Sequence, residues 1–177
     1  ALGDPSLRVR FFAAQALGRL GDRESVGPLF ALLRENADRD VFLRHAAVLA
    51  LSRIGDAEAI AARAGDASRA VRLAVLLVWR RAGDPRIAAF LDDADPLLVV
   101  EAARAIYDVP IDAAMPALAT RLAALEPAGA DDRQVGQALH RRAIGANVRL
   151  RSAEGAAALA RYVADERQLE SLRSLAL

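Results

Sequence analysis

One short phrase recurs along the first half of the chain and constrains the fold more than any other feature of the sequence. An Asp is followed six residues later by an Arg, and then by an Ala- and Leu-rich stretch that closes on Arg, an apolar residue, Gly and Asp. The phrase closes at residues 19–22, 53–56 and 81–84, so its turn glycines are 34 and 28 residues apart. Such a period is typical of stacked helix pairs, in which each pair buries its apolar face against the next.

The composition favours helices throughout the chain. Hydrophobic residues make up 54% of it and aromatic residues only 5%, and Ala and Leu are the strongest apolar helix formers. We therefore predict an all-α fold, a right-handed α-solenoid of about five stacked antiparallel helix pairs. We expect a single domain over residues 1–177, with units at about 4–37, 38–65, 66–92, 93–125 and 131–164 and a partial unit at 165–177.

Turn and cap residues predict the boundaries of individual helices. Asp4 is placed to cap the first helix, with Pro5 at its first position, where the missing N–H costs nothing. Gly21 is expected to end that helix. The later helices are expected at residues 25–34, 41–54, 57–64, 112–125, 133–148 and 153–164, with a loop at 126–132.

The charges are nearly balanced. There are 24 basic and 23 acidic residues, which gives a net charge of +1. Every basic residue is Arg, which we interpret as the mark of a GC-rich genome rather than of selection at binding sites. The balance argues against a dedicated nucleic-acid-binding protein, which should carry a net basic field.

Several classes of site are excluded within this sequence. The chain has no Cys, so it holds no disulfide, thiolate zinc site or covalently attached c-type haem. No apolar run approaches the length of a membrane span. The sequence begins without Met and inside a turn, and we therefore expect a segment of a longer protein.

The recurring phrase, written Asp-Pro-x-x-x-Val-Arg with an Ala-rich helix and Leu-Gly-Asp, resembles HEAT repeats, in particular the short variety also found in phycobilin lyase subunits. The resemblance is strong over residues 4–91 and weaker beyond them. It implies that the Asp and Arg are structural and form a hydrogen-bonded ladder along the stack. The pairs implied are Asp4 with Arg10, Asp38 with Arg44, and Asp66 with Arg72. Asp93 aligns with Val99 in the fourth unit, so the ladder should break there.

A narrower resemblance rests on residues 40–47, on 90–97 with 101–106, and on 142–150. These stretches look like the HEAT segment of large secreted proteins of planctomycete-type bacteria. There the segment lies between a β-propeller and a c-type cytochrome domain. The resemblance implies a periplasmic spacer or docking arm; without it we leave the compartment open, with the cytoplasm as the alternative.

The two histidines and the sole Trp have structural and functional interpretations. Neither His45 nor His140 has a His or Cys three or four residues away, so structural hydrogen bonding or exposure is favoured over a metal or proton-transfer role. Trp79 lies in the most apolar predicted helix and is expected in the core; on a solvent face it would be an anchor for a protein partner. We expect no metal and no cofactor.

Two charged clusters also have two interpretations. Arg141, Arg142, Arg149 and Arg151, with Asn147 among them, could bind phosphate. The favoured interpretation is a solvated face that Asp131, Asp132 and Glu154 neutralise. The pairs at residues 92–93 and 131–132 lack the alternating oxygen ligands of a calcium loop, so helix capping is the simpler explanation.

The sequence contains no nucleophile–base arrangement and no phosphate-cradling Gly-rich loop, so we predict a protein that is not an enzyme. The leading hypothesis is a scaffold for a protein partner or for neighbouring domains of the same chain. Its binding surface would be formed by the second helices, which carry Arg34, Arg63, Arg86, Arg121 and Arg161. A nucleic-acid-binding module and a phycobilin-lyase-like chromophore binder are the alternatives.

Overall fold

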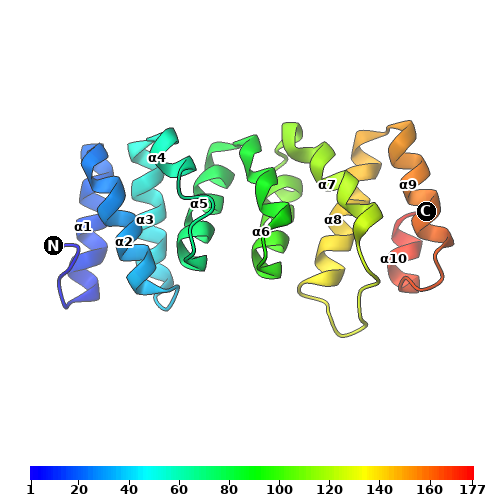
Figure 1. Ribbon diagram of the computed structural model, residues 1–177, viewed down its shortest axis with the longest axis horizontal. Helices are drawn as coiled ribbons and strands as arrows, with labels where there is room; N and C mark the ends of the chain where they lie inside the picture. The colour runs from blue at the N-terminus through cyan, green and yellow to red at the C-terminus, as the bar shows by residue number, and fades with distance from the viewer. The chain divides into compact units, whose positions relative to one another are not determined.

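A computed structural model describes residues 1–177, and every regular element in it is a helix. The chain divides into two compact units, Ala1–Ala82 and Gly83–Leu177. Each unit consists of antiparallel helices that lie side by side (Figure 1). None of these helices is both long enough and apolar enough to cross a membrane. That the whole chain acts as a single domain stays a prediction.

The first unit contains the first two helix pairs and the first helix of the third. Its elements are α1 (Leu7–Leu20), η1 (Arg23–Ser25), α2 (Val26–Asn36), α3 (Val41–Ile54), α4 (Ala57–Ala61) and α5 (Arg69–Ala82). Helices α1 and α3 pack against each other, and α2 packs on α3 and α5. The core of this unit is aliphatic, and its fully buried side chains include Leu29, Leu33, Leu43, Leu51 and Leu76.

The recurrent Gly-Asp phrase ends one helix and begins the next. Gly21 and Gly55 adopt left-handed φ values of 69° and 68°, which glycine reaches without steric cost. The Asp that follows each glycine then caps a new helix: the carboxylate of Asp22 accepts from the Glu24 N–H, and that of Asp56 from the Ala59 N–H. The sharp reversal between paired helices is therefore encoded in two adjacent residues.

Helices α1 and α3 approach closely where the sequence places a glycine inside a helix. A Cβ on residue 18 would lie 2.5 Å from the Cα of Ala50, which is far inside van der Waals contact. Ala50 and Gly18 are both buried. The crossing therefore needs a residue without a side chain, although glycine weakens a helix interior by about 1 kcal/mol relative to Ala.

The second unit continues the pattern of α-helices with short 3-10 helices between some of them. Its elements are η2 (Pro85–Asp92), α6 (Pro96–Asp108), η3 (Asp112–Ala114), α7 (Met115–Arg121), η4 (Leu122–Ala124), α8 (Gly136–Leu150), α9 (Ala153–Ala164) and α10 (Glu170–Leu175). Helix α8 packs against α6, α7 and α9. The fully buried side chains of this unit include Ile87, Leu91, Leu98, Ile106 and Met115.

Several predicted boundaries differ from those observed. Helix α1 begins at Leu7 and not at Pro5, because the carboxylate of Asp4 accepts from the Ser6 N–H and forms a turn before the helix. The segment at 112–125 is split into η3, α7 and η4, and the predicted helix at 133–148 begins only at Gly136. The predictions at 41–54 and 153–164 agree with α3 and α9.

The contact between Gly18 and Ala50 generates a stability prediction. Gly18→Ala should lower the free energy of unfolding of the first unit by about 1–3 kcal/mol, because the added methyl group overpacks the crossing. Urea unfolding followed by the fluorescence of Trp79, the sole Trp and a residue of this unit, measures the change. Gly65→Ala is the matched control: it lies in the turn after α4 with open space around its Cα and without a left-handed φ, so it should change the free energy of unfolding by no more than about 0.5 kcal/mol. Equal unfolding midpoints for the two variants would contradict the close crossing.

Candidate functional site

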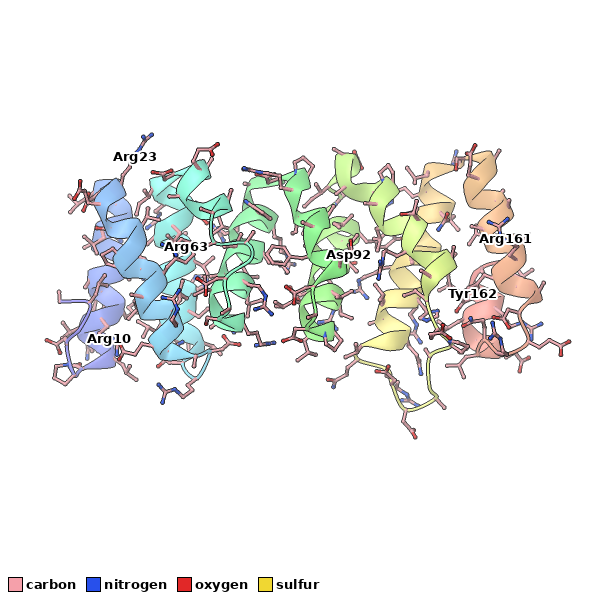
Figure 2. The ribbon with its side chains drawn as sticks, viewed as in Figure 1. Arg10, Arg23, Arg63, Asp92, Arg161 and Tyr162 are labelled. Carbon is pink, nitrogen blue, oxygen red and sulfur yellow. The ribbon has the colours of Figure 1, made fainter.

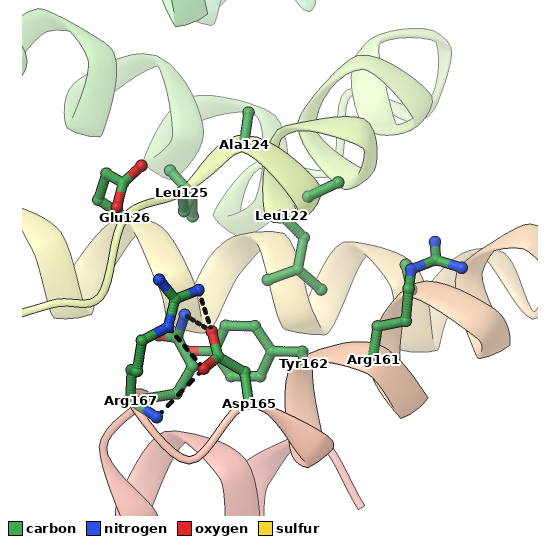
Figure 3. Close-up of a pocket in the computed structure, with 11 residues that line it drawn as sticks. Leu122, Ala124, Leu125, Glu126, Arg161, Tyr162, Asp165 and Arg167 are labelled. Atoms are coloured by element: carbon green, nitrogen blue, oxygen red, sulfur yellow. Dashed lines mark hydrogen bonds and ion pairs between the residues drawn. The ribbon is translucent and has the colours of Figure 1, made fainter.

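A pocket of about 260 Å³ opens in the second unit between the α7–η4 segment and α9 (Figure 3). Leu122 and Leu125 supply an apolar wall. The opposite wall is polar and comes from the last turns of α9 and the chain that follows it. Its residues are Arg161, Tyr162, Asp165, Arg167 and Gln168. The pocket thus lies between the second helices of two successive repeats.

Local sequence fixes both ends of α9, which carries this polar wall. At its start, Ser152 Oγ accepts from the Gly155 N–H at 2.9 Å. At its end, Asp165 has extended backbone angles, and its carboxylate accepts from the Arg167 N–H at 3.1 Å. This turn directs the side chains after the helix back towards the pocket.

Asp165 is the centre of a hydrogen-bonded group in the pocket wall. Arg167 donates through Nε to Oδ1 at 2.9 Å and through Nη2 to Oδ2 at 3.0 Å, and Gln168 donates through Nε2 to Oδ2 at 3.2 Å. The Arg167 side-chain hydrogen bonds lower the pKa of Asp165 to about 2. Asp165 in turn raises the pKa of Arg167. Both groups are therefore ionised at neutral pH, and their charges cancel.

A buried histidine forms hydrogen bonds with two residues that line the pocket. His140 is 2% exposed; its Nδ1 lies 2.7 Å from the Tyr162 hydroxyl, and its Nε2 lies 3.0 Å from the Glu126 carbonyl oxygen. A carbonyl oxygen only accepts, so Nε2 carries the proton and Nδ1 accepts from the Tyr162 hydroxyl. Burial lowers the pKa of His140, against smaller opposing effects of the Glu126 carbonyl and the Asp132 charge. His140 thus has a structural role as a neutral ring.

Burial also acts on the hydroxyl partner of that histidine. It raises the pKa of Tyr162 to about 12, with the Asp165 charge as the smaller cause. The hydroxyl therefore stays protonated and donates to His140 across the whole neutral range. Tyr162 and Glu126 both line the pocket, and both form hydrogen bonds with His140. The two walls of the pocket are therefore connected to α8 through His140.

Two of the predicted partner-binding arginines converge on one carboxylate in the first unit. Arg34 Nη2 lies 2.6 Å from Asp66 Oδ2, and Arg63 Nη1 lies 4.0 Å from the same oxygen. The Ser68 N–H is the largest cause of the lowered pKa of Asp66, and Arg34 and Arg63 lower it further. Both guanidinium groups remain about half exposed, so they are positioned and still accessible.

The other three predicted arginines belong to the second unit and differ from one another. Arg86 pairs with Asp84 at 2.6 Å, two residues before it, and Arg121 pairs with Asp92 at 2.6 Å, from the preceding repeat. Arg161, on α9, forms no ion pair and is exposed (Figure 2). The three arginines of the second unit therefore have different surroundings, and of these three only Arg161 lines the pocket.

The implied ladder forms differently at each step. Asp38 accepts from its predicted partner Arg44 and also from Arg69 Nη1, at 3.3 Å, which belongs to the next repeat. Arg10, by contrast, donates to Glu35 at 3.0 Å and not to Asp4. The Asp4 pairing was wrong because Asp4 is engaged in the turn before α1.

At the third step the arginine contacts the backbone. Arg72 Nη1 donates to the carbonyl oxygens of Asp66 and Ala67, at 2.9 and 3.3 Å. In the fourth unit, the carboxylate of Asp93 accepts from the Asp95 N–H at 2.8 Å, while Val99 has no polar side chain to continue the series. The acid and base of the phrase thus stabilise turns and neighbouring repeats.

Other predicted candidates lie outside the pocket. His45 is exposed and Trp79 is 4% exposed, as expected for a core residue. No group of three or more His, Asp or Glu side chains is arranged to hold a metal ion. The carboxylates of Asp92 and Asp132 contact Arg121 and the Val135 N–H.

In the predicted basic cluster, two arginines contact residues other than the acidic ones predicted, and one of these contacts is an ion pair. Arg142 pairs with Asp108 at 2.8 Å, and Arg149 lies over the Tyr107 ring at 4.2 Å from its centroid. Asp131 and Glu154 take no part in these contacts. Arg141 lies 3.5 Å from Gln137, and Arg151 ends α8 with a left-handed φ of 51°. Asn147, predicted among the arginines, is buried and donates to the carbonyls of Ala119 and Ala143.

Most residues of the pocket were not predicted from the sequence. Tyr162, Asp165, Arg167 and Gln168 were not singled out, although Asp165 and Arg167 repeat a signal present in the third unit. There Asp84 accepts from both the N–H and the guanidinium of Arg86, two residues on. An Asp-x-Arg segment after a helix therefore predicts this turn. The contact between His140 and Tyr162 spans 22 residues and has no such local signal.

Comparison with known proteins supports the repeat assignment for the first part of the chain. Residues 1–62, which span α1 to α4, match the family model described as HEAT repeats. With its stacked antiparallel helices, the chain is an all-α solenoid. No curated protein matches the sequence.

The ion pair of Arg44 with Asp38 generates a second stability prediction. Arg44→Ala should lower the free energy of unfolding of the first unit by about 1–3 kcal/mol, because it removes a hydrogen bond to a mostly buried charge. Urea unfolding monitored by Trp79 fluorescence is the measurement. Arg19→Ala, an exposed arginine without an ion pair, should change it by no more than about 0.5 kcal/mol. An unchanged midpoint for Arg44→Ala would show that the pair contributes nothing.

The neutral His140 predicts a pH dependence of the second unit. The folded state lowers the pKa of His140 below its ordinary value of 6.5, so the unfolded state binds the proton first as the pH falls. Stability is then fully present above about pH 6.5 and decreases below it, by at most about 1.4 kcal/mol per pH unit. Urea titrations between pH 7.5 and 5, monitored by tyrosine circular dichroism, measure the slope.

His140→Gln should abolish most of that slope, whereas His45→Gln, at the exposed histidine, should leave it unchanged. Both Tyr residues of the chain lie in the second unit, so the signal reports on that unit. A slope that persists in His140→Gln would assign the pH dependence to other groups.

Proposed function

We propose that this chain is a non-enzymatic scaffold that binds a protein partner, or a neighbouring domain of its own parent chain, on the surface of its second helices. HEAT repeats are commonly protein-interaction scaffolds, and residues 1–62 match that family. The surface of this chain that binds the partner would include Arg34, Arg63, Arg86, Arg121 and Arg161.

The observation that carries the proposal is the fixed position of charged groups on these helices. Asp66, at the start of the third repeat, holds Arg34 of the first, and Asp92 holds Arg121 of the next repeat. A guanidinium that is already positioned loses less conformational freedom on binding. The second helices thus present ordered donors on a rigid support, which suits recognition of a polar protein surface.

The alternatives have less support. The net charge is +1, and Arg142 and Arg149 of the α8 cluster already have partners, so a continuous basic groove for nucleic acid is not favoured. Pockets that enclose drug-sized ligands usually have about 300–1,000 Å³. The pocket at α9, with about 260 Å³, is small for a chromophore such as a linear tetrapyrrole.

The finer resemblance to secreted planctomycete-type proteins identifies one class of partner to test. In that architecture the partners would be a β-propeller and a cytochrome domain of the same chain, and the segment would be periplasmic. Sequencing the surrounding reading frame tests this directly: a propeller upstream and a haem-attachment motif downstream support it, and a frame that lacks both contradicts it.

Capture from native lysate tests the scaffold proposal and its face. The immobilised protein should retain a protein partner, and Arg63→Glu, in the turn after α4, combined with Arg161→Glu, on α9, should lose most of it. Arg19→Glu with Arg141→Glu is the matched control, because it changes the net charge equally on the first helices. If the wild-type protein retains nothing, the scaffold proposal is wrong; if the control loses the partner equally, the binding face is wrong.

A further inference from the structure

Helix α1 carries apolar or small residues on two opposite faces. One face contains Ala14 and Gly18, which are buried, and Gly18 lies against Ala50 of α3. The opposite face has apolar residues spaced by three or four positions, which places them in one line along a helix. This stripe consists of Val9, Phe12, Ala16 and Leu20. All four residues are exposed, so only one of the two faces of α1 is covered.

The equivalent stripe in the second repeat is covered by α1. The turn glycines of the first two repeats are 34 residues apart, so equivalent positions of α1 and α3 differ by that number. The residues equivalent to the stripe are Leu43, Ala46, Ala50 and Ile54. Exposure falls from 42% at Val9 to 2% at Leu43, and from 77% at Leu20 to 9% at Ile54. The cause is the packing of α1 on α3, which buries this face of α3.

The third repeat shows the same relation. Helix α5 packs against α3, and α1, α3 and α5 lie in a row in Figure 1. The residues of α5 at the first three stripe positions, 28 residues further along, are Val71, Ala74 and Val78. All three are buried. Each of these first helices thus covers the stripe of the next one, and the stripe of α1 is the one that stays exposed.

We propose that the stripe of α1 is a stacking face that receives a further helix pair of the same repeat kind, contributed by the same polypeptide before residue 1. The first helix of that pair lies on the stripe as α1 lies on α3. The inference goes beyond the proposed binding surface, which is formed by the second helices, and does not depend on it.

The residues of the stripe suit such a helix better than a solvent-exposed end or a second copy of this chain. A terminal repeat of a solenoid needs a polar outer face for solubility, whereas Phe12 and Leu20 are large and apolar. Ala16 is at the position of Ala50, so the receiving side of the close crossing keeps its small residue. A second copy that paired stripe to stripe would place Phe12 and Leu20 where α1 presents a glycine. We therefore expect the incoming helix to carry Gly or Ala opposite Ala16.

A copy of the first repeat is the probe, because its α1 already packs on a face of this kind. Residues 4–37 are inserted before Asp4 of the full chain, so that residue 37 of the copy precedes Asp4 as it precedes Asp38. The chain has no Cys, so Val9→Cys in the original α1 supplies a single thiol in the stripe. Its reaction with DTNB should be at least about tenfold slower in the extended chain than in the 177-residue chain, because a buried thiol reacts only when the contact opens.

Two matched variants show whether the protection comes from this face. Phe42→Cys, at an exposed residue of α3 outside the stripe positions, should react at the same rate in both chains. Ala16→Phe in the original α1, combined with Val9→Cys, should restore most of the fast reaction in the extended chain, because the added ring blocks the crossing. In the 177-residue chain Ala16→Phe should leave the urea midpoint of unfolding unchanged, since residue 16 is exposed there.

Three results would overturn the inference. The stripe receives no repeat if Val9→Cys reacts equally fast in both chains, or if Ala16→Phe leaves it protected in the extended chain. The face is an interface between copies if sedimentation shows that the 177-residue chain is a dimer in which this thiol is already protected. A parent reading frame that encodes no helix pair directly before residue 1 would remove the source. In each case, capture of a partner that depends on Arg63 and Arg161 would still support the scaffold proposal.

Discussion

The reversal at the Gly-Asp turn is the constraint on which the first helix pairs of this chain depend. A helix must end with its last carbonyls satisfied and the next must begin with its first N–H groups satisfied. Gly21 and Gly55 meet the first requirement by adopting left-handed angles, and Asp22 and Asp56 meet the second by accepting backbone N–H groups. With both in adjacent positions, the chain turns back on itself within one or two residues, and the paired helices face each other closely.

Charged side chains act in this protein mainly over short distances, on turns and between successive repeats. Asp38 contacts arginines from its own repeat and the next, Asp66 fixes Arg34, and Arg142 reaches Asp108. Exposed pairs of this kind contribute little stability each, commonly no more than about 1 kcal/mol. Their larger consequence is positional, because a paired guanidinium has a defined place on the surface. An almost neutral chain thereby carries an ordered pattern of charge.

The pocket at α9 combines a neutral buried histidine with a charged turn. His140 forms hydrogen bonds with the Tyr162 hydroxyl and the Glu126 carbonyl oxygen. Asp165 accepts hydrogen bonds from the side chains of Arg167 and Gln168. Within this arrangement the buried Oε1 of Gln168 has no hydrogen-bond partner, and the exposed Arg161 forms no ion pair. Together the buried histidine and the turn after α9 fix the shape of the pocket.

The sequence by itself determined the all-helical fold and the positions of the turns, because glycine conformation and Asp capping act within a few residues. It also placed Trp79 in the core, since apolar periodicity is local. Only the tertiary structure decided which charged groups form ion pairs. Arg10 pairs with Glu35, 25 residues away, and Arg142 pairs with Asp108, 34 residues away. It likewise brought His140 to Tyr162 and left Gln168 Oε1 unpaired. Such contacts depend on how successive repeats are packed, and no spacing along the chain records that packing.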